Sequence, residues 1–448
     1  MPRMFGTDGV RGLANRDITP HLALELGEAA ARYVARSSNG SGSRPRAIIG
    51  RDTRLSGEFL DHALAAGLAA AGMDVTRIGV ATTPMVAHLT ATENVELGAM
   101  ISASHNPMPD NGIKFFAHGG FKLEDRVEDT IERLIGEPWE RPVGEAVGEI
   151  EFDDSRASSS YIEHLVGAVG TSLKGLRIAV DAANGSASKF GPEALREAGA
   201  DVVVINASPD GRNINDDCGS THPEQLQAFT VASKADFGVA YDGDADRCLA
   251  VDAEGNLVDG DKIMGALALD LRRRGKLFDD TLVITVMSNL GLVLAMKEQG
   301  INTVQTAVGD RYVLEEMRAK GYTLGGEQSG HVIASHHATT GDGVLTSLLI
   351  ARMLKETDRS LAEATAFVKR LPQILINVGG VDKKRTDDEA VVAAVREAEE
   401  RLGETGRVVL RPSGTEPLVR VMVEAATQEQ ADHEAGLIAE VVKERLSL

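Results

Sequence analysis

Three aspartates at alternate positions, Asp242, Asp244 and Asp246, follow the apolar run 237–240 and Tyr241. Carboxylates at this spacing can close on one hard cation such as Mg²⁺. An apolar strand that ends in three like charges needs a cation or a proton to neutralise them. The loop does not match a calcium-binding helix–loop–helix, because the glycine required at its turn would fall on Arg247. A solvated acidic turn remains the alternative to a metal site.

A second reactive pattern lies in segment 102–107, where Ser104 and His105 precede an Asn-Pro turn. A serine can carry a covalent group only if another group takes its proton and another stabilises the developing charge. His105 and Lys114, which is ten residues after Ser104, are candidates for these roles. Serine and Asn-Pro are also common in turns, so an ordinary turn is the alternative.

Two further segments carry side chains suited to binding a sugar phosphate. In the glycine-rich segment 325–331, Glu327 and Ser329 suit neighbouring sugar hydroxyls, although a plain glycine turn would also explain the pattern. Segment 411–417, with the arginine that follows it, predicts a phosphate cradle built from hydroxyls, backbone N–H groups and two guanidinium groups. Its candidate residues are Arg411, Ser413, Gly414, Thr415 and Arg420.

Near the N-terminus, the glycines of segment 5–12 permit close approach, and Arg11 is a candidate phosphate ligand. No Walker A pattern is present in the sequence, because its Gly-Lys pair at 275–276 is followed by leucine. ATP-driven phosphoryl transfer is therefore disfavoured.

Length, charge and cysteine content limit the number of domains, the partners and the location that can be expected. The 448 residues are too many for one core, and three or four domains are expected. A formal net charge of −20 argues against nucleic acid or an anionic membrane as a partner. We find no secretory signal peptide and no apolar run near the ~18 residues of a membrane span. Because the two cysteines supply no disulfide framework, a cytoplasmic location is expected.

One strand–helix–strand pattern occurs three times, which predicts three similar α/β units with parallel strand pairs. The first strands are 46–50, 177–181 and 281–286, and the second strands are 74–78, 201–205 and 301–305. The helix between them stops each time at a glycine, namely Gly72, Gly199 and Gly300. A third strand then leads into the loops 102–107, 242–247 and 325–331. Since ligands collect at the carboxyl ends of parallel strands, we expect these three loops to face one shared site.

After about residue 371 the pattern changes to a small α+β module. Strands are expected at 373–378, 407–411 and 418–424, and helices at 386–402 and 428–446.

Taken in order, five segments of this chain resemble the signatures of the α-D-phosphohexomutase superfamily. They are 5–12, 101–107, 242–247, 326–331 and 411–415, and the resemblance covers essentially the whole chain. A small departure is Ala245, where the family often has a second glycine. The resemblance implies three similar α/β domains with mixed sheets and a C-terminal α+β domain around a central cleft. The expected domains are 1–155 (phosphoserine), 156–256 (metal), 257–370 (sugar) and 371–448 (phosphate).

The resemblance also implies roles for the residues. Ser104 would carry the phosphoryl group, and its phosphate would join Asp242, Asp244 and Asp246 in holding one Mg²⁺ per subunit. Groups that serve the transferring phosphate and proton transfer would be Arg11, His105, Lys114 and Arg247. Groups that bind the sugar would be Glu327, Ser329 and His331, and the cradle of Arg411, Ser413, Gly414, Thr415 and Arg420 would hold the phosphate that is not transferred.

The implied activity is an intramolecular phosphotransferase of the isomerase class that interconverts glucosamine 6-phosphate and glucosamine 1-phosphate. A sugar 1,6-bisphosphate would be the intermediate and activator, and a hexosamine phosphate the substrate, within amino-sugar nucleotide synthesis. A homodimer is compatible with the sequence. Mannose or glucose phosphates as substrates are the first alternative. A Mg²⁺-dependent sugar phosphatase and a non-catalytic sugar-phosphate binding protein are further alternatives.

Overall fold

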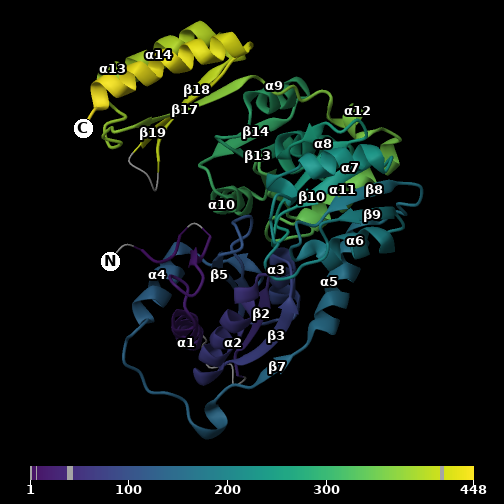
Figure 1. Ribbon diagram of the computed structural model, residues 1–448, viewed down its shortest axis with the longest axis vertical. Coiled ribbons are helices and arrows are strands. Elements are labelled where there is room, and N and C mark those ends of the chain that lie inside the picture. The colour runs from purple at the N-terminus through teal and green to yellow at the C-terminus, as the bar shows by residue number, and fades with distance from the viewer. Residues whose placement is uncertain (1–2, 7, 38–43, 414–417) are drawn as a thin grey trace. The chain divides into compact units, whose positions relative to one another are not determined.

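The computed structural model describes residues 3–6, 8–37, 44–413 and 418–448. The chain forms two compact units, residues 1–285 with 306–365, and residues 286–305 with 366–448. Strands and helices alternate through the first unit, whereas the C-terminal segment forms a sheet with two long helices on one face (Figure 1). Among the helices described, none is both long enough and apolar enough to cross a membrane.

The first sheet is mixed, with the order β1-β5-β4-β2-β3-β7 and β6 beside β5. Its central strands β2, β3 and β4 are parallel, and β5 runs antiparallel to β1 and β4. Its strands are β1 (Val10–Leu13), β2 (Arg46–Arg51), β3 (Asp74–Val80), β4 (Leu97–Ile101), β5 (Asp110–Ala117), β6 (Phe121–Lys122) and β7 (Ile150–Phe152). The accompanying helices are α1 (Pro20–Ser37), α2 (Leu55–Ala70), α3 (Thr83–Thr92), α4 (Asp125–Leu134) and the 3₁₀ turn η1 (Gly144–Ala146).

The second sheet has the order β12-β11-β10-β8-β9, with β8 parallel to both β9 and β10. Its strands are β8 (Arg177–Asp181), β9 (Asp201–Ile205), β10 (Phe237–Tyr241), β11 (Cys248–Asp252) and β12 (Leu257–Val258). The helices are α5 (Asp154–Val169), α6 (Ala187–Glu197), α7 (Glu224–Ala232) and η2 (Gly219–Thr221). Strand β10 is buried along its whole length, so its carboxyl end carries the loop 242–247 out of the core.

A third group of strands in the same unit repeats this construction. Strand β13 (Thr281–Thr285) lies parallel to β15 (Leu324–Gly326), which pairs antiparallel with β16 (Val332–Ala334). The helices are α8 (Gly260–Arg273), η3 (Phe278–Asp280), α10 (Asp310–Lys320), α11 (Gly343–Thr357) and α12 (Leu361–Thr365). The hairpin between β15 and β16 therefore carries the loop 327–331.

The second unit contains α9 (Leu290–Glu298), β14 (Asn302–Thr306) and an antiparallel sheet of order β17-β19-β18. The sheet is formed by β17 (Gln373–Gly379), β18 (Arg407–Pro412) and β19 (Leu418–Glu424). Helices α13 (Glu389–Leu402) and α14 (Gln428–Leu446) bury their apolar stripes against it, with η4 (Gly403–Thr405) between α13 and β18. Buried Glu424 joins parts of this unit, because its carboxylate accepts from Leu290 N at 2.9 Å and from Arg407 Nε at 2.7 Å.

These elements confirm the fold class expected from the sequence, three α/β groups with mixed sheets and a C-terminal α+β module. The glycines at 72, 199 and 300 all have positive φ just after a helix, as C-caps require. Several strand ends differ from the expected ones by one or two residues, and two further boundaries were wrong. The helix expected from Thr386 begins at Glu389, because the Asp388 side chain caps it by accepting from Ala390 N. Gly325 and Gly326, expected in a loop, belong to β15.

Candidate functional site

Ser104 lies in the short connection between β4 and β5, buried at 1% exposure. Its Oγ donates a hydrogen bond of 2.5 Å to Oδ2 of Asp242 and lies 3.3 Å from Nδ1 of His105. Its backbone has a φ of 52°, in the left-handed region that serine seldom occupies. A nucleophile-type hydroxyl, an imidazole and a carboxylate therefore meet at one point.

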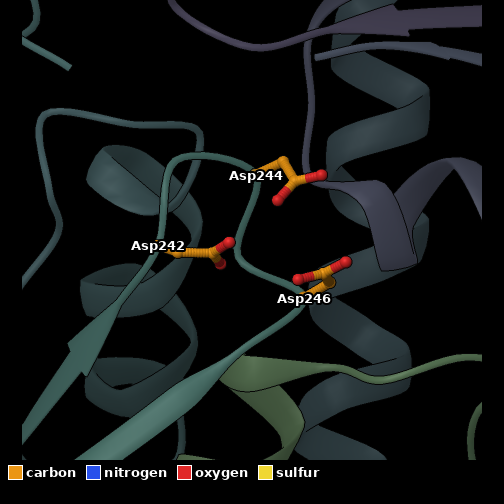
Figure 2. A group of neighbouring side chains, drawn as sticks. All are labelled: Asp242, Asp244 and Asp246. Atoms are coloured by element: carbon orange, nitrogen blue, oxygen red, sulfur yellow. The ribbon is translucent and has the colours of Figure 1, made fainter. Parts of the chain in front are cut away.

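The three aspartates of the β10–β11 loop form a compact group. Figure 2 shows the carboxylates of Asp242, Asp244 and Asp246 pointing toward one another across the loop. One oxygen from each lies within 4.8 Å of the others, and all three side chains are buried. Burial, followed by Asp246 and Asp244, raises the pKa of Asp242 well above its usual range. Carboxylates packed this closely repel one another and favour a cation as a partner.

The donor set fits a hard cation. Oδ1 of Asp244 and Oδ1 of Asp246 are buried and have no hydrogen-bond partner, which is costly for a carboxylate oxygen. Oxygen ligands in a small, buried carboxylate group are what Mg²⁺ prefers. In the described part of the chain, this is the one place where three or more His, Cys, Asp or Glu side chains lie close enough to hold one metal ion. We call Asp242, Asp244 and Asp246 the metal-type aspartate group. The group can hold a metal ion.

Lys114, on β5, lies among these carboxylates. Its Nζ donates to Oδ2 of Asp244 at 2.8 Å and lies 3.7 Å from Oδ2 of Asp246. Burial disfavours its charge, but Asp244, Asp8 and Asp246 outweigh that effect and raise the pKa of Lys114. The ammonium is therefore charged at neutral pH and cannot act as a base in this state. It can stabilise negative charge next to Ser104.

His105 has the opposite electrostatic environment. Burial, and then the charges of Arg247 and Arg11, lower the pKa of His105 to about 4. At neutral pH the imidazole is uncharged and can accept a proton. Arg247 donates from its backbone N to Oδ1 of Asp242 at 3.2 Å, and Asp242 and Asp246 keep its guanidinium charged against the effect of burial. Arg11 pairs with Asp8.

The loop 327–331, which joins β15 to β16, reaches the aspartate group through His331. His331 accepts from Gly341 N at Nε2, 3.1 Å, so its ring proton lies on Nδ1, 3.7 Å from Oδ2 of Asp246. Glu327 is half-buried and its Oε1 accepts from Gly309 N at 3.2 Å, which orients the carboxylate. Ser329 is exposed. The three loops that end β4, β10 and β15 thus lie together in the first unit, as their sequence positions predict.

The predicted phosphate cradle lies in the second unit. Arg411 on β18 and Arg420 on β19 are direct cross-strand partners, so two guanidinium groups share one end of the hairpin. Burial and then Arg420 lower the pKa of Arg411. Ser413 N donates to Leu418 O at 2.9 Å, which closes the hairpin. Gly414 and Thr415 lie outside the described residues.

Three side chains near these sites, Lys122, Thr83 and Lys383, have no counterpart in the sequence analysis. Lys122, buried, donates from Nζ to Oδ1 of Asp8 at 2.5 Å and also contacts Asp310, so it joins the N-terminal loop to the start of α10. Thr83 Oγ1 donates to Oδ2 of Asp244 at 2.5 Å. In the second unit, Lys383 Nζ donates to Ser413 O at 2.6 Å. Only Thr83 carried a signal in the sequence, because it begins α3 just after the parallel strand β3, where ligands collect.

Models of the phosphoglucomutase/phosphomannomutase family match the chain in four consecutive parts. They are the α/β/α domains I, II and III, at residues 2–141, 159–255 and 259–371, and the C-terminal domain at 375–441. The phosphoglucosamine mutase of Bifidobacterium animalis subsp. lactis is 62% identical, and that of Streptomyces griseus subsp. griseus 58%. Both alignments cover 100% of this chain and 100% of the relative.

Solved structures share the fold at lower identity. A phosphoglucomutase/phosphomannomutase family protein from Burkholderia thailandensis has a TM-score of 0.83 at 23% identity, over 99% of this chain and 97% of that one. The Aspergillus fumigatus N-acetylphosphoglucosamine mutase, in complex with GlcNAc-6P and magnesium, has a TM-score of 0.71 at 19% identity, over 98% and 95%. With the site geometry and the family matches along its length, this chain belongs to the phosphoglucomutase/phosphomannomutase family.

Proposed function

We propose that this chain interconverts glucosamine 6-phosphate and glucosamine 1-phosphate, with Ser104 as the carrier of the phosphoryl group. The observation that carries the proposal is the 2.5 Å contact between Ser104 Oγ and the metal-type aspartate group, with the Lys114 ammonium beside it. The full-length relatives at 57–62% identity that are named phosphoglucosamine mutase support the same substrate.

The proposed reaction needs no external phosphoryl donor. Phosphorylated Ser104 gives its phosphoryl group to the free hydroxyl of the hexosamine phosphate, which becomes the 1,6-bisphosphate. The bisphosphate then turns over, and Ser104 takes the phosphoryl group from the other end. One phosphoryl bond forms and one breaks in each half-reaction, so the enzyme returns to its starting state. A sugar 1,6-bisphosphate added from outside would restore phosphate to an enzyme that has lost it.

Each half-reaction also moves a proton. The neutral imidazole of His105, 3.3 Å from Ser104 Oγ, is suited to take and return it. Lys114, Arg247 and Arg11 place positive charge where the transferring phosphate develops negative charge. Asp242, Asp244 and Asp246, together with the phosphate on Ser104, would hold one Mg²⁺, which would supply further neutralisation of that charge.

The sugar and the second phosphate need separate binding groups. Glu327, Ser329 and His331 would bind the amine and hydroxyls of the sugar. The phosphate that is not transferred would lie in the cradle of Arg411, Ser413, Gly414, Thr415 and Arg420. We also propose four domains with the limits 1–155, 156–256, 257–370 and 371–448. The matched family ranges support them.

The test compares kcat/KM for glucosamine, glucose and mannose 1-phosphates, each with its own 1,6-bisphosphate. Glucosamine 1-phosphate is expected to lead. An advantage of tenfold or more for glucose or mannose phosphate, about 1.4 kcal/mol in transition-state binding, would assign the chain to those sugars instead. Accumulation of inorganic phosphate alone would indicate a phosphatase.

A second experiment tests the carrier. Peptide mapping of the isolated protein should find one phosphate on the peptide that contains Ser104. The variant Ser104→Ala should lose mutase activity by several orders of magnitude, since no other hydroxyl contacts Asp242 in the described structure. Full activity in that variant would end the proposal.

A further inference from the structure

Two side chains from opposite sides hold the backbone of the Ser104 loop. The carbonyl oxygen of Ser104 accepts from Nη2 of Arg54 at 3.3 Å and from Nδ2 of Asn215 at 2.9 Å. The carbonyl oxygen of Asn106 accepts from the same two groups, at 3.1 Å in the case of Asn215. Arg54 lies at the start of α2, and Asn215 lies in the long connection between β9 and α7. Arg54 and Asn215 thus form a clamp on the Ser104 loop, one from the first sheet's domain and one from the second's.

The backbone N of Ser104 is held as well. It donates to Oγ of Ser102 at 2.9 Å, and Ser102 Oγ donates to Oδ2 of Asp52 at 2.6 Å. The same Asp52 carboxylate pairs with Arg54 and accepts from its backbone N at 2.9 Å. The backbone C=O of Ser104 therefore bonds to Arg54, and its backbone N–H is connected through Ser102 to Asp52, the ion-pair partner of Arg54.

This arrangement is closely packed. Arg54 is fully buried, with 0% of its side chain exposed, and it is among the largest buried side chains in the described protein. A Cβ placed on Gly243 would lie 2.6 Å from Ser104 O and 2.9 Å from Asn215 Nδ2. The metal-type loop is thus pressed against the clamped carbonyl, so the loop cannot shift without moving that contact.

We propose that Arg54 and Asn215 are positioning residues for phosphoryl transfer. They hold Ser104 at its positive φ so that its Oγ stays aimed at the aspartate group throughout the cycle. This inference rests on the proposed role of Ser104 as phosphoryl carrier. Their contacts with the Ser104 loop are to backbone carbonyl oxygens and not to the hydroxyl: Nη2 of Arg54 and Nδ2 of Asn215 both donate to Ser104 O, while Nη1 of Arg54 pairs with Asp52.

The need for such a clamp follows from energetics. A left-handed φ at a residue other than glycine is strained and persists only when its surroundings enforce it. Phosphorylation adds a charge of about −1.5 to −2 at this residue, which pulls on the same loop. A displacement of about 1 Å of a reacting group can cost about a hundredfold in rate. A relaxed loop would also expose the phosphoserine to water.

The experiment uses Asn215→Ala and Arg54→Lys in the full-length protein. Asn213→Ala is the control for the first, because Asn213 lies in the same loop and bonds within it, to Ser208 O and Asp210 N. Arg77→Lys is the control for the second, because Arg77 makes a bidentate pair with Asp61 away from the Ser104 loop. For each protein we measure kcat and KM with glucosamine 1-phosphate. We also measure the fraction of phosphoserine transferred to glucosamine 6-phosphate rather than lost to water.

The clamp predicts a fall in kcat of about tenfold or more for Asn215→Ala, with KM changed by less than about threefold. It also predicts that the ratio of transfer to hydrolysis falls by about tenfold. That ratio is measured per phosphorylated molecule, so partial unfolding does not change it. The controls should stay within about twofold of the parent protein. If Arg54→Lys fails to fold, Asn215→Ala decides the result.

The experiment distinguishes a failure of the clamp from a failure of the proposed function. If the parent protein carries phosphate on Ser104 and Asn215→Ala matches Asn213→Ala in kcat and in the transfer ratio, the clamp is wrong and the proposed function stands. If the parent protein carries no phosphate on Ser104 and Ser104→Ala stays active, the proposed function is wrong and the clamp has no role to serve.

Discussion

The Oγ of Ser104 and the Oδ2 of Asp242 lie 2.5 Å apart, although 138 positions separate the two residues in the chain. Each residue follows a buried strand, Ser104 after β4 and Asp242 after β10. The contact joins the first and second sheets of the first unit and brings a reactive hydroxyl to a group of carboxylates.

Asp244→Asn should reduce mutase turnover by orders of magnitude and leave the fold intact. The change removes one of the two orphaned carboxylate oxygens and one negative charge from the metal-type group. The measurement is activity across a Mg²⁺ titration, with circular dichroism as the check on folding. Asp153→Asn is the matched control, because Asp153 is the N-cap of α5 and accepts from Arg156 N, outside this group. Undiminished activity of the parent protein in excess chelator would exclude a catalytic metal.

Arg411→Lys should lower kcat/KM about tenfold or more in both reaction directions. The substitution keeps the charge but removes the planar fork that grips a phosphate at two points. Both ends of the sugar must visit this cradle in the proposed cycle, so the two directions should suffer alike. Initial rates from glucosamine 6-phosphate and from glucosamine 1-phosphate give the comparison. A defect confined to one direction would place Arg411 at another site.

The contribution of His88 to the free energy of unfolding should fall as the pH drops from about 6.5 to about 4. Burial, and then His164 stacked against it with ring centroids 4.2 Å apart, lower the pKa of His88 from 6.5 to about 4. Between those values the unfolded chain binds a proton at His88 that the folded chain does not, so the free energy of unfolding rises with pH. The stabilisation is complete above pH 6.5 and is lost progressively toward pH 4.

The measurement is the melting temperature as a function of pH for the parent protein and His88→Gln. The variant should show a shallower fall than the parent protein in this window, because a neutral amide has no proton to gain. His21→Gln serves as the control, since His21 is exposed on α1. Identical slopes for the parent protein and His88→Gln would contradict the assignment.

Gly67→Ala should destabilise the first unit by about 1–3 kcal/mol, as overpacking does in a close-packed core. Helices α1 and α2 approach so closely here that a Cβ on Gly67 would lie 2.1 Å from the carbonyl oxygen of Leu24. Gly436→Ala on α14 is the matched control, because a Cβ there meets no atom within 4 Å. That variant should be neutral or stabilising by up to about 1 kcal/mol, since alanine favours helix. Thermal unfolding of both variants gives the comparison.

Much of the local structure follows from the sequence alone. The runs 177–181 and 201–205 coincide with β8 and β9, because a short apolar strand followed by a glycine-stopped helix has few other solutions. The three reactive loops could be located for the same reason, since each follows a strand of a repeated unit. The start of α13 did not follow from the sequence in the same way. The cap at Asp388 depends on one side chain meeting one backbone N–H, which apolar periodicity does not reveal.

The sequence by itself determined which residues could do chemistry here, because the types and spacing of Ser104, His105 and the three aspartates restrict what they can bind. Only the tertiary structure decided their protonation. The low pKa of His105 and the retained charge of Lys114 arise from burial and from charges that other segments bring close. The tertiary structure also decided which residues hold the Ser104 loop in place. Arg54 and Asn215 lie far from Ser104 in the chain. Their contacts with the carbonyl oxygen of Ser104 depend on how strands β2, β4 and β9 place their carboxyl ends, a packing relationship that no local pattern encodes.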